Sequence, residues 1–539
     1  MIKAVKAAAA VILLFLSGCN LRGPASHPYD VVILGGTPSA VAAAVAAARQ
    51  GARVCLIAQN ERLGGMMASG LGWTGLGDPA YIGGIAAGVF AEIAAHYRHS
   101  YGPESGQFNN CSAGFRFEPH VAEQVFEQLV AAEKIEVLRG WVLADCYAER
   151  NRMESITVRH RKTGRQREIG ALVFIDATYT GDLFAEAGAP FYLGRESRDI
   201  FGEKLAGRIY QDPRTRKPLT GSTGAGDSLI QAYTYRLCLT DSAGNSAQWP
   251  EPERYDPGEY GLIRDFIRAG GERAFSDFMV FSPLPNRKYD IDSNGFCWLS
   301  TDLIGASQGY PAGTEQQRRE IEKRHMEHIL GLWKFLRSDP DIPENLRSRF
   351  SRFYPAKDEF GDNRHLPFQI YVREARRLHG ISTFSEKDAL ADTLKEDAIG
   401  MGSYPLASHA TGRLRPGYPW REGFFIQPCR PYQIPYFIMT PVWVRNLLVS
   451  CCVSASHVGY GTLRFEPVFM IMGQAAGVAA HLCKKYNCQV DEVPLPELQQ
   501  LLRAQGAILS HAEARPWKEA LEEDNQGLVK KKVRHTAGR

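Results

Sequence analysis

Two short apolar runs with a helix-like segment between them form the clearest hydrophobic pattern near the start of the chain. Residues 31–34 and 54–57 are uninterrupted apolar runs, as in strands that are buried on both faces of a sheet. Residues 40–49 are rich in alanine and favour a helix, which Pro38 can begin and Gly51 can end. The pattern therefore predicts a strand–helix–strand unit of about 30 residues.

The turn between the first strand and this helix has the features of a phosphate-binding turn. It reads Gly35-Gly36-Thr37-Pro38-Ser39-Ala40. Compared with the dinucleotide fingerprint G-x-G-x-x-G/A, the first and third small positions match, whereas Thr37 replaces the second glycine. Backbone N–H groups at a helix N-terminus favour a pyrophosphate, so we expect this turn to bind one.

A second glycine pair follows the second strand, at Gly64-Gly65-Met66. Together the two motifs resemble a bacterial family of FAD-dependent oxidoreductases that share Gly-Gly-Thr-Pro and a following Gly-Gly-Met. The resemblance implies FAD as the cofactor, with its adenosine half above the first turn. The acid that normally holds the ribose at the end of strand two is missing, because its position falls at about Ala58. Either Gln59 or Glu61 could replace it.

Later segments extend the same resemblance. In flavoproteins of this class an Ala-Thr-x-x-Gly-Asp break brings the chain close to the cofactor, and residues 177–182 carry this motif. A strand at 446–450, a loop of small residues to 461 and a helix at 468–480 resemble the part that closes over the ribityl chain and the flavin. The strand at 135–143 resembles the one whose end touches the adenine. Implied cofactor contacts are therefore Val142, Ala177, Thr178, Gly181, Asp182, Ser454, Gln474, Ala475, Ala476 and Gly477.

The resemblance implies an α/β fold in which a Rossmann-like FAD domain of the two-dinucleotide-binding type is interrupted by a large inserted substrate domain. We expect the FAD domain to occupy residues 29–190 and, as its closing part, residues 431–485. Residues 191–430 are richer in aromatic residues, arginine and proline and lack the strand–helix rhythm, as expected of a substrate or cap domain. Residues 486–539 are expected to form a peripheral segment with a helix near 495–509.

Residues 1–18 have the features of an export signal. Lys3 and Lys6 precede an apolar run at 7–16, which is too short to span a bilayer. The run ends in Leu-Ser-Gly-Cys19, which resembles a bacterial lipobox, where the signal is removed before the cysteine and the thiol is acylated. The sequence therefore predicts a lipid anchor at Cys19, a tether at 19–28 and a place on a bacterial envelope membrane, at its periplasmic or outer face. A plain secretory signal is the alternative.

The overall composition is that of an ordinary globular protein, with 44% hydrophobic residues, 23% charged residues and a net charge of +4 over 539 residues. No basic stretch carries interleaved aromatic residues, so we expect no nucleic-acid partner. The basic tail at 530–535 has the features of a solvated terminus. The 11 cysteines include no C-x-x-C pair, so we expect no structural metal. Cys451 and Cys452 are interpreted as buried small residues, with a redox pair as the alternative.

Candidate catalytic side chains lie in the second half of the chain. His409 and His457 are candidate general bases, because histidine titrates near neutral pH, although either could be a hydrogen-bonded structural residue. Arg373 lies in a segment, 371–377, that we predict to be helical; it could bind an anionic group, or belong to a solvated face of paired charges.

The expected activity is FAD-dependent oxidoreduction of a small molecule, with an unidentified electron acceptor. Two other classes stay open: a flavin-free binding or scaffold lipoprotein on the same fold, and a nicotinamide-dependent dehydrogenase.

Overall fold

The computed structural model describes residues 28–212, 215–268, 279–294, 300–391, 393–412 and 421–516. The predicted signal peptide, Cys19 and all but the last residue of the tether lie outside these residues, as does the basic tail. Within the described ranges, no helix combines the length and the apolar composition that crossing a membrane requires.

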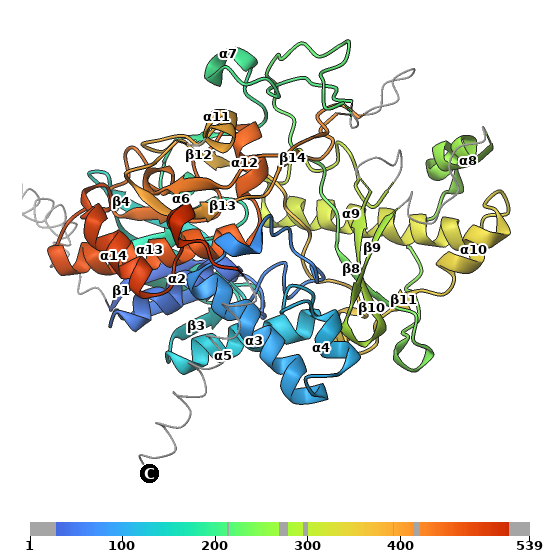
Figure 1. Ribbon diagram of the computed structural model, residues 1–539, viewed down its shortest axis with the longest axis horizontal. Helices are drawn as coiled ribbons and strands as arrows, with labels where there is room; N and C mark the ends of the chain where they lie inside the picture. Colours follow the sequence, from blue (N-terminus) through green and yellow to red (C-terminus); the bar gives the residue numbers. More distant parts are fainter. Residues whose placement is uncertain are drawn as a thin grey trace, which may run out of the picture.

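The predicted strand–helix–strand unit is confirmed and forms the centre of a seven-stranded sheet (Figure 1). β1 (Tyr29–Leu34) pairs in parallel with β2 (Val54–Ala58) on one side and with β6 (Gln166–Asp176) on the other. α2 (Pro38–Arg49) connects β1 to β2, with Pro38 in its first turn as predicted. The strand order is β3-β2-β1-β6-β5-β4, and β17 (Leu447–Val449) joins the sheet by pairing in parallel with β6.

The long strand β6 serves two parts of this sheet. Its second half is parallel to β1 and β17, whereas its first half pairs antiparallel with β5. β1 is buried on both faces, as its apolar run predicts: Val31 and Ile33 pack with α2, while Val32 and Leu34 pack with residues of β5 and α6. The remaining elements of this part are β3 (Glu136–Arg139), β4 (Trp141–Glu149), β5 (Arg152–His160), α3 (Gly84–Tyr101), α4 (Gly106–Asn110), α5 (Pro119–Ala132) and α6 (Asp182–Glu186).

α13 (Glu466–Tyr486) lies directly against α2, although the two helices are more than 400 residues apart in the chain. A Cβ atom at Gly473 would lie 2.2 Å from the backbone oxygen of Ser39, and one at Gly477 would lie 2.2 Å from that of Ala43. The small residues of both helices are therefore required by their close approach.

A second sheet, antiparallel and of four strands, lies at the opposite end of the molecule (Figure 1). Its order is β11-β8-β10-β9, and the long helix α9 (Glu315–Ser338) runs beside it. The elements of this region are β8 (Leu237–Thr240), β9 (Met279–Leu284), β10 (Lys288–Ser293), β11 (Tyr354–Pro355), α8 (Gly261–Arg268) and α10 (Glu344–Phe350). The short helix α7 (Arg198–Phe201) lies apart from them, at the top of Figure 1.

Three two-stranded sheets accompany the two larger ones in the described part of the chain. β7 (Phe191–Tyr192) pairs with β12 (Arg377–Leu378), β14 (Leu406–Ser408) with β15 (Phe425–Gln427), and β13 (Ala398–Gly402) with β16 (Tyr432–Pro435). The last pair crosses the predicted boundary at residue 430, and the division of the chain into domains stays a prediction. The other helices are α11 (Glu386–Leu390), α12 (His457–Leu463) and α14 (Leu495–Ala504).

Two local predictions are wrong. Residues 371–377 are not helical: Tyr371 forms an isolated bridge with Thr234, and β12 begins at Arg377. Their arginines bond to distant partners, which an extended backbone allows and a surface helix would not. Residues 457–461, predicted as part of a loop, belong to α12, which extends to Leu463. The Ser456 side chain caps its first turn by accepting a hydrogen bond from the Gly459 N–H.

Lys288 on β10 connects the second sheet to the first region through buried ion pairs. Its buried ammonium lies 2.7 Å from carboxylate oxygens of Glu118 and Glu359 and 2.8 Å from one of Asp358. Glu118 directly precedes α5. Burial alone would lower the pKa of Lys288, but the surrounding carboxylates raise it above its usual value. Glu118, His120 and Glu359 are close enough to hold a metal, yet the ammonium already bonds both carboxylates.

We expect Lys288→Met to lower the free energy of unfolding by about 3–5 kcal/mol, because it leaves two buried carboxylates without their cation. Urea denaturation measures this loss. Lys323→Met is the matched control, since Lys323 pairs with Glu253 at an exposed site and its loss should leave the stability nearly unchanged. Equal effects of the two substitutions would contradict a stabilising role for the buried cluster.

Candidate cofactor site

The turn after β1 is shaped by a close approach to the end of β6. Gly35 has a φ of +136°, and a Cβ atom there would lie 2.5 Å from the backbone oxygen of Ala177. The Thr37 side chain points inward, where it accepts from the Ala40 N–H at 3.1 Å and donates to the Ala177 oxygen at 2.8 Å. Thr37 thus caps α2 instead of blocking the turn, which explains how it can replace the second glycine of the fingerprint.

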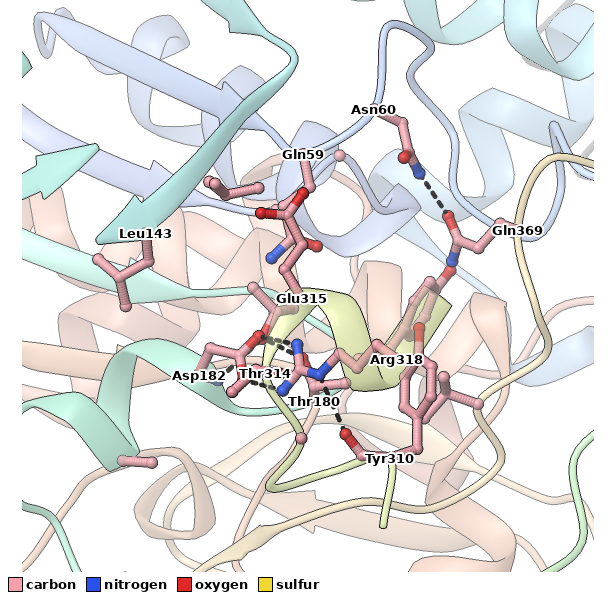
Figure 2. A pocket seen from close by; sticks show the side chains of 18 of the residues that line it. Gln59, Asn60, Leu143, Thr180, Asp182, Tyr310, Thr314, Glu315, Arg318 and Gln369 are labelled. Atoms are coloured by element: carbon pink, nitrogen blue, oxygen red, sulfur yellow. Dashed lines mark hydrogen bonds and ion pairs between the residues drawn. The ribbon is translucent and has the colours of Figure 1, made fainter. Parts of the chain in front are cut away.

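A cavity of about 1050 Å³ opens above this turn, at the carboxyl ends of the parallel strands. This volume is at the upper end of the range of about 300–1,000 Å³ for small-molecule sites, as a long cofactor requires. Its walls come from the β1–α2 turn, the end of β2, the start of β4, the segment after β6 and the beginning of α9, and Figure 2 shows these side chains around it. Ligands of open α/β sheets bind at this edge.

The adenosine end of such a cofactor would meet amide groups. Ala58, at the position where related proteins carry the ribose-binding acid, is fully buried in the sheet and does not line the cavity. Gln59 lines the cavity, and Asn60 beside it donates to the Gln369 side chain at 3.1 Å (Figure 2). Glu61 is not among the lining residues and pairs with Lys162 at 2.8 Å. Of the two replacements considered from sequence, Gln59 is the one at the cavity wall.

The cavity wall is rich in arginine. Arg318 contacts both carboxylate oxygens of Asp182, at 2.8 and 2.6 Å (Figure 2). Arg376 adds a contact with Asp182 at 2.9 Å. Burial by itself would raise the pKa of Asp182, but these two guanidinium groups hold it below its usual range. Counting all lining residues, five arginines face four carboxylates, which suits a bound anion such as a pyrophosphate.

A buried carboxyl group lies behind one wall of the cavity. The hydroxyl of the lining residue Tyr179 donates to Glu466 Oε1 at 2.6 Å and accepts from the Met66 N–H at 3.2 Å. The other oxygen, Oε2, has no hydrogen-bond partner among the described residues. Burial raises the pKa of Glu466 to about 8, so this carboxyl carries a proton at neutral pH.

Comparisons with known proteins agree with this geometry. The profile of the family described as FAD dependent oxidoreductase matches residues 30–502. The chain belongs to this family.

Solved structures of flavoproteins are also similar to the chain. The myxobacterial chondrochloren halogenase CndH is 12% identical with a TM-score of 0.39, and the match covers 95% of this chain and 90% of that one. A geranylgeranyl bacteriochlorophyll reductase-like protein from Thermoplasma acidophilum is 10% identical with a TM-score of 0.35, covering 89% and 84%. No curated protein matches. At these TM-scores the likenesses support no inference about the substrate.

The family match shows that the protein is an FAD-dependent oxidoreductase, and its parallel strands form a Rossmann-type fold. Both alternative classes considered from sequence are therefore set aside. The residues around the cavity fit the cofactor: a glycine turn and a helix N-terminus face its floor, and arginines line its walls. Of the residues predicted to bind the cofactor, those that line the cavity are Gly35, Gly36, Thr37, Gln59, Val142, Thr178 and Asp182.

Other predicted cofactor residues support the turn from behind. The Gly64 and Gly65 N–H groups donate to the Gly36 oxygen, and Met66 follows them. Ser39 donates to the hydroxyl of Ser450 at 2.8 Å, which joins the first turn of α2 to the end of β17. Pro38 and Ala40 lie in that same helical turn, Ala177 accepts from Thr37, and Gly181 immediately precedes α6.

The predicted closing segment is not among the residues that line the cavity. Ser454 is buried and its backbone N–H donates to the Ile438 oxygen. Gln474 accepts from the Ile85 N–H at 2.9 Å, and Gly477 packs against Ala43. Ala475 and Ala476 are fully buried in the same helix. Helix packing explains these small side chains, so their contact with the flavin stays a prediction.

The three candidate catalytic residues come together in one buried polar network outside the cavity lining. Asp302 bonds to His409 Nδ1 at 2.8 Å and to Arg373 at 2.7 Å. Arg373 also donates to the Ala232 oxygen and to Ser293, whereas its Nε has no hydrogen-bond partner among the described residues. His457 Nδ1 lies 2.9 Å from both oxygens of Glu374.

Several site residues were missed from the sequence. Arg318 and Arg376 bear no local signal, because their partner Asp182 is 136 and 194 residues away. Glu466 did have one: it is a lone acid in an apolar stretch just before a proline at a helix start.

The protonation of Glu466 predicts a pH dependence of the apoprotein. Its pKa is higher in the folded state, at about 8, than the ordinary value of 4.5 expected after unfolding. This raised pKa contributes stability that is fully present below about pH 4.5 and is lost as the pH rises towards 8, by at most about 1.4 kcal/mol per pH unit. We expect Glu466→Gln to remove this loss. Urea unfolding of both apoproteins from pH 5 to 8 measures it, and parallel curves would contradict a buried neutral carboxyl.

Proposed function

We propose that this protein is tethered to a bacterial envelope membrane through Cys19 and uses FAD to oxidise or reduce a small polar molecule. The observation that carries the proposed cofactor position is one continuous cavity, lined by the β1–α2 turn, the end of β2 and the segment after β6. This arrangement matches the extended shape of a dinucleotide across the edge of a parallel sheet.

In this proposal each part of the wall has a separate task. The N–H groups after Gly35 and the positive end of α2 bind the pyrophosphate. Gln59 binds the ribose hydroxyls in place of the missing acid, and Val142 contacts the adenine. FAD, when bound, supplies the hydride or electron chemistry. The chain's own residues bind and orient the substrate and hold or accept its proton.

His409 is the better supported of the two candidate bases. Burial lowers its pKa to about 4, so the ring is neutral at pH 7, while the pKa of Asp302 lies below its usual range because of Arg373 and His409. The ionised Asp302 therefore accepts the Nδ1 proton, which leaves the lone pair on Nε2. His457 by contrast has both ring nitrogens engaged, with Glu374 and with Ser408 at 3.4 Å.

The cofactor position is tested by Gly36→Glu. A Cβ atom at Gly36 would lie 3.2 Å from the Cβ of Ala58, and the added carboxylate would repel the phosphates. We expect loss of at least 90% of the bound flavin, measured by absorbance of the purified protein. Gly244→Glu is the control, because Gly244 is exposed and a Cβ atom added there would have no neighbour within 4 Å. A folded Gly36→Glu variant with a full flavin content would overturn the proposed binding turn.

The proposed anchor is tested separately. Cys19→Ser removes the thiol that the lipobox needs, so labelling with a radioactive fatty acid in a bacterial host should fall to background and the protein should leave the membrane fraction. Cys146→Ser, at a partly exposed cysteine within the fold, should keep both properties. Undiminished labelling of the Cys19→Ser protein would refute the lipid anchor without affecting the cofactor assignment.

A further inference from the structure

Arg464 is a buried arginine at the junction between α12 and α13. Only 4% of its surface is exposed to solvent. Nη1 lies 3.5 Å from the Tyr371 hydroxyl and Nη2 lies 3.3 Å from the Ala407 oxygen, both long for hydrogen bonds, and Nε has no partner among the described residues. Its guanidinium carbon lies 4.9 Å from the ring centre of Phe465. The charge is thus held among weak, neutral contacts.

Other buried arginines of the protein, by contrast, pair with carboxylates. Arg236 donates to Asp290 at 2.8 and 2.6 Å and to Asp292 at 2.8 Å. Arg377 pairs with Glu196 at 2.8 Å and with Glu374 at 3.0 Å. In the described part of the chain, no carboxylate lies within ion-pair distance of Arg464. A buried charge without a counter-ion is unfavourable, so the protein retains Arg464 for a reason other than stability.

The surroundings of Arg464 connect it to the cofactor site. Its contact Tyr371 lies in the chain between Gln369 and Val372, which both line the cavity. Two residues after Arg464, Glu466 bonds to the lining residue Tyr179. On another side, Arg464 Nη2 lies 3.3 Å from the backbone oxygen of Ala407, two residues before His409. Arg464 therefore contacts both the segment that carries two lining residues and β14, the strand that directly precedes the proposed base.

We propose that Arg464 binds a carboxylate group of the substrate and thereby holds the substrate beside His409. A guanidinium group offers a planar pair of N–H donors that matches a carboxylate, and the hydroxyl of Tyr371 can add a third bond. A single arginine suits a singly charged carboxylate better than a doubly charged phosphate. This inference rests on the proposed function and adds the substrate class, a small carboxylic acid.

The stability of two variants separates a binding role from a structural one. Arg464→Met keeps most of the side-chain volume and removes an uncompensated charge, so we expect a melting temperature equal to or above that of the wild type. Arg236→Met is the matched control, because it leaves the buried Asp290 without its counter-ion and should lower the melting temperature. If Arg464→Met is destabilised as strongly as Arg236→Met, or fails to fold, Arg464 is structural and the proposal is wrong.

Binding is measured with the FAD-loaded protein and four probes, acetate, lactate, succinate and benzoate, each compared with its uncharged amide. We expect at least one carboxylate to change the flavin spectrum and raise the melting temperature, with at least tenfold weaker binding to Arg464→Met and intermediate binding to Arg464→Lys. Amides should have no effect. The proposal is overturned if no carboxylate binds the wild type, if binding is equal in the Arg464→Met protein, or if inorganic phosphate alone produces the effect.

Flavin content is determined for every protein in this experiment. A wild-type protein without FAD would contradict the proposed function, whereas a yellow wild-type protein whose carboxylate response does not depend on Arg464 would contradict only the substrate site. The two failures are therefore distinguishable.

Discussion

The contact between α2 and α13 is the constraint on which the rest of the site depends. Backbone oxygens of α2 lie only 2.2 Å from the positions that Cβ atoms of Gly473 and Gly477 would occupy. The two helices could not approach so closely if either glycine carried a side chain. This contact fixes the start of α2, and with it the turn at Gly35, relative to the start of α13. Because it joins segments more than 400 residues apart, the cofactor site forms only when both ends of the chain have folded together.

The middle of the chain completes the same site through charge. Arg318, at the beginning of α9, crosses the cavity to Asp182, and Arg376 meets the same carboxylate from another segment. The ion pairs lie in a wall that is largely shielded from water, where the attraction between opposite charges is stronger than at the surface. Loss of either partner would leave a buried charge uncompensated. Lys288 plays the corresponding part at the far side of the molecule, where three carboxylates from two segments surround it.

The sequence predicts this fold where the signal is local. The apolar runs, the glycine pairs and the break at 177–182 lie within short windows, and they place the central strands and the floor of the cavity correctly. Partners at long separations leave no such signal, as in the Tyr179–Glu466 bond, which spans 287 residues. Such partners also override local pattern: the charged segment 371–377 resembles a surface helix, yet Arg373 is almost completely buried and bonds to distant groups. An extended backbone lets successive side chains point to opposite sides, so neighbouring arginines can serve different parts of the network.

The junction between α12 and α13 shows how local geometry can keep an acidic and a basic side chain apart. Arg464 follows the last residue of α12 and reaches towards Tyr371, whereas Glu466 begins α13 and reaches towards Tyr179. Residues two positions apart at a helix end do not face each other. Arg464 and Glu466 therefore do not form an ion pair, although they are close in the sequence. Glu466 responds by retaining its proton, which a carboxyl group can do, but a guanidinium group cannot lose its charge. The positive charge of Arg464 therefore stays uncompensated within the described fold, and an anionic ligand could compensate it.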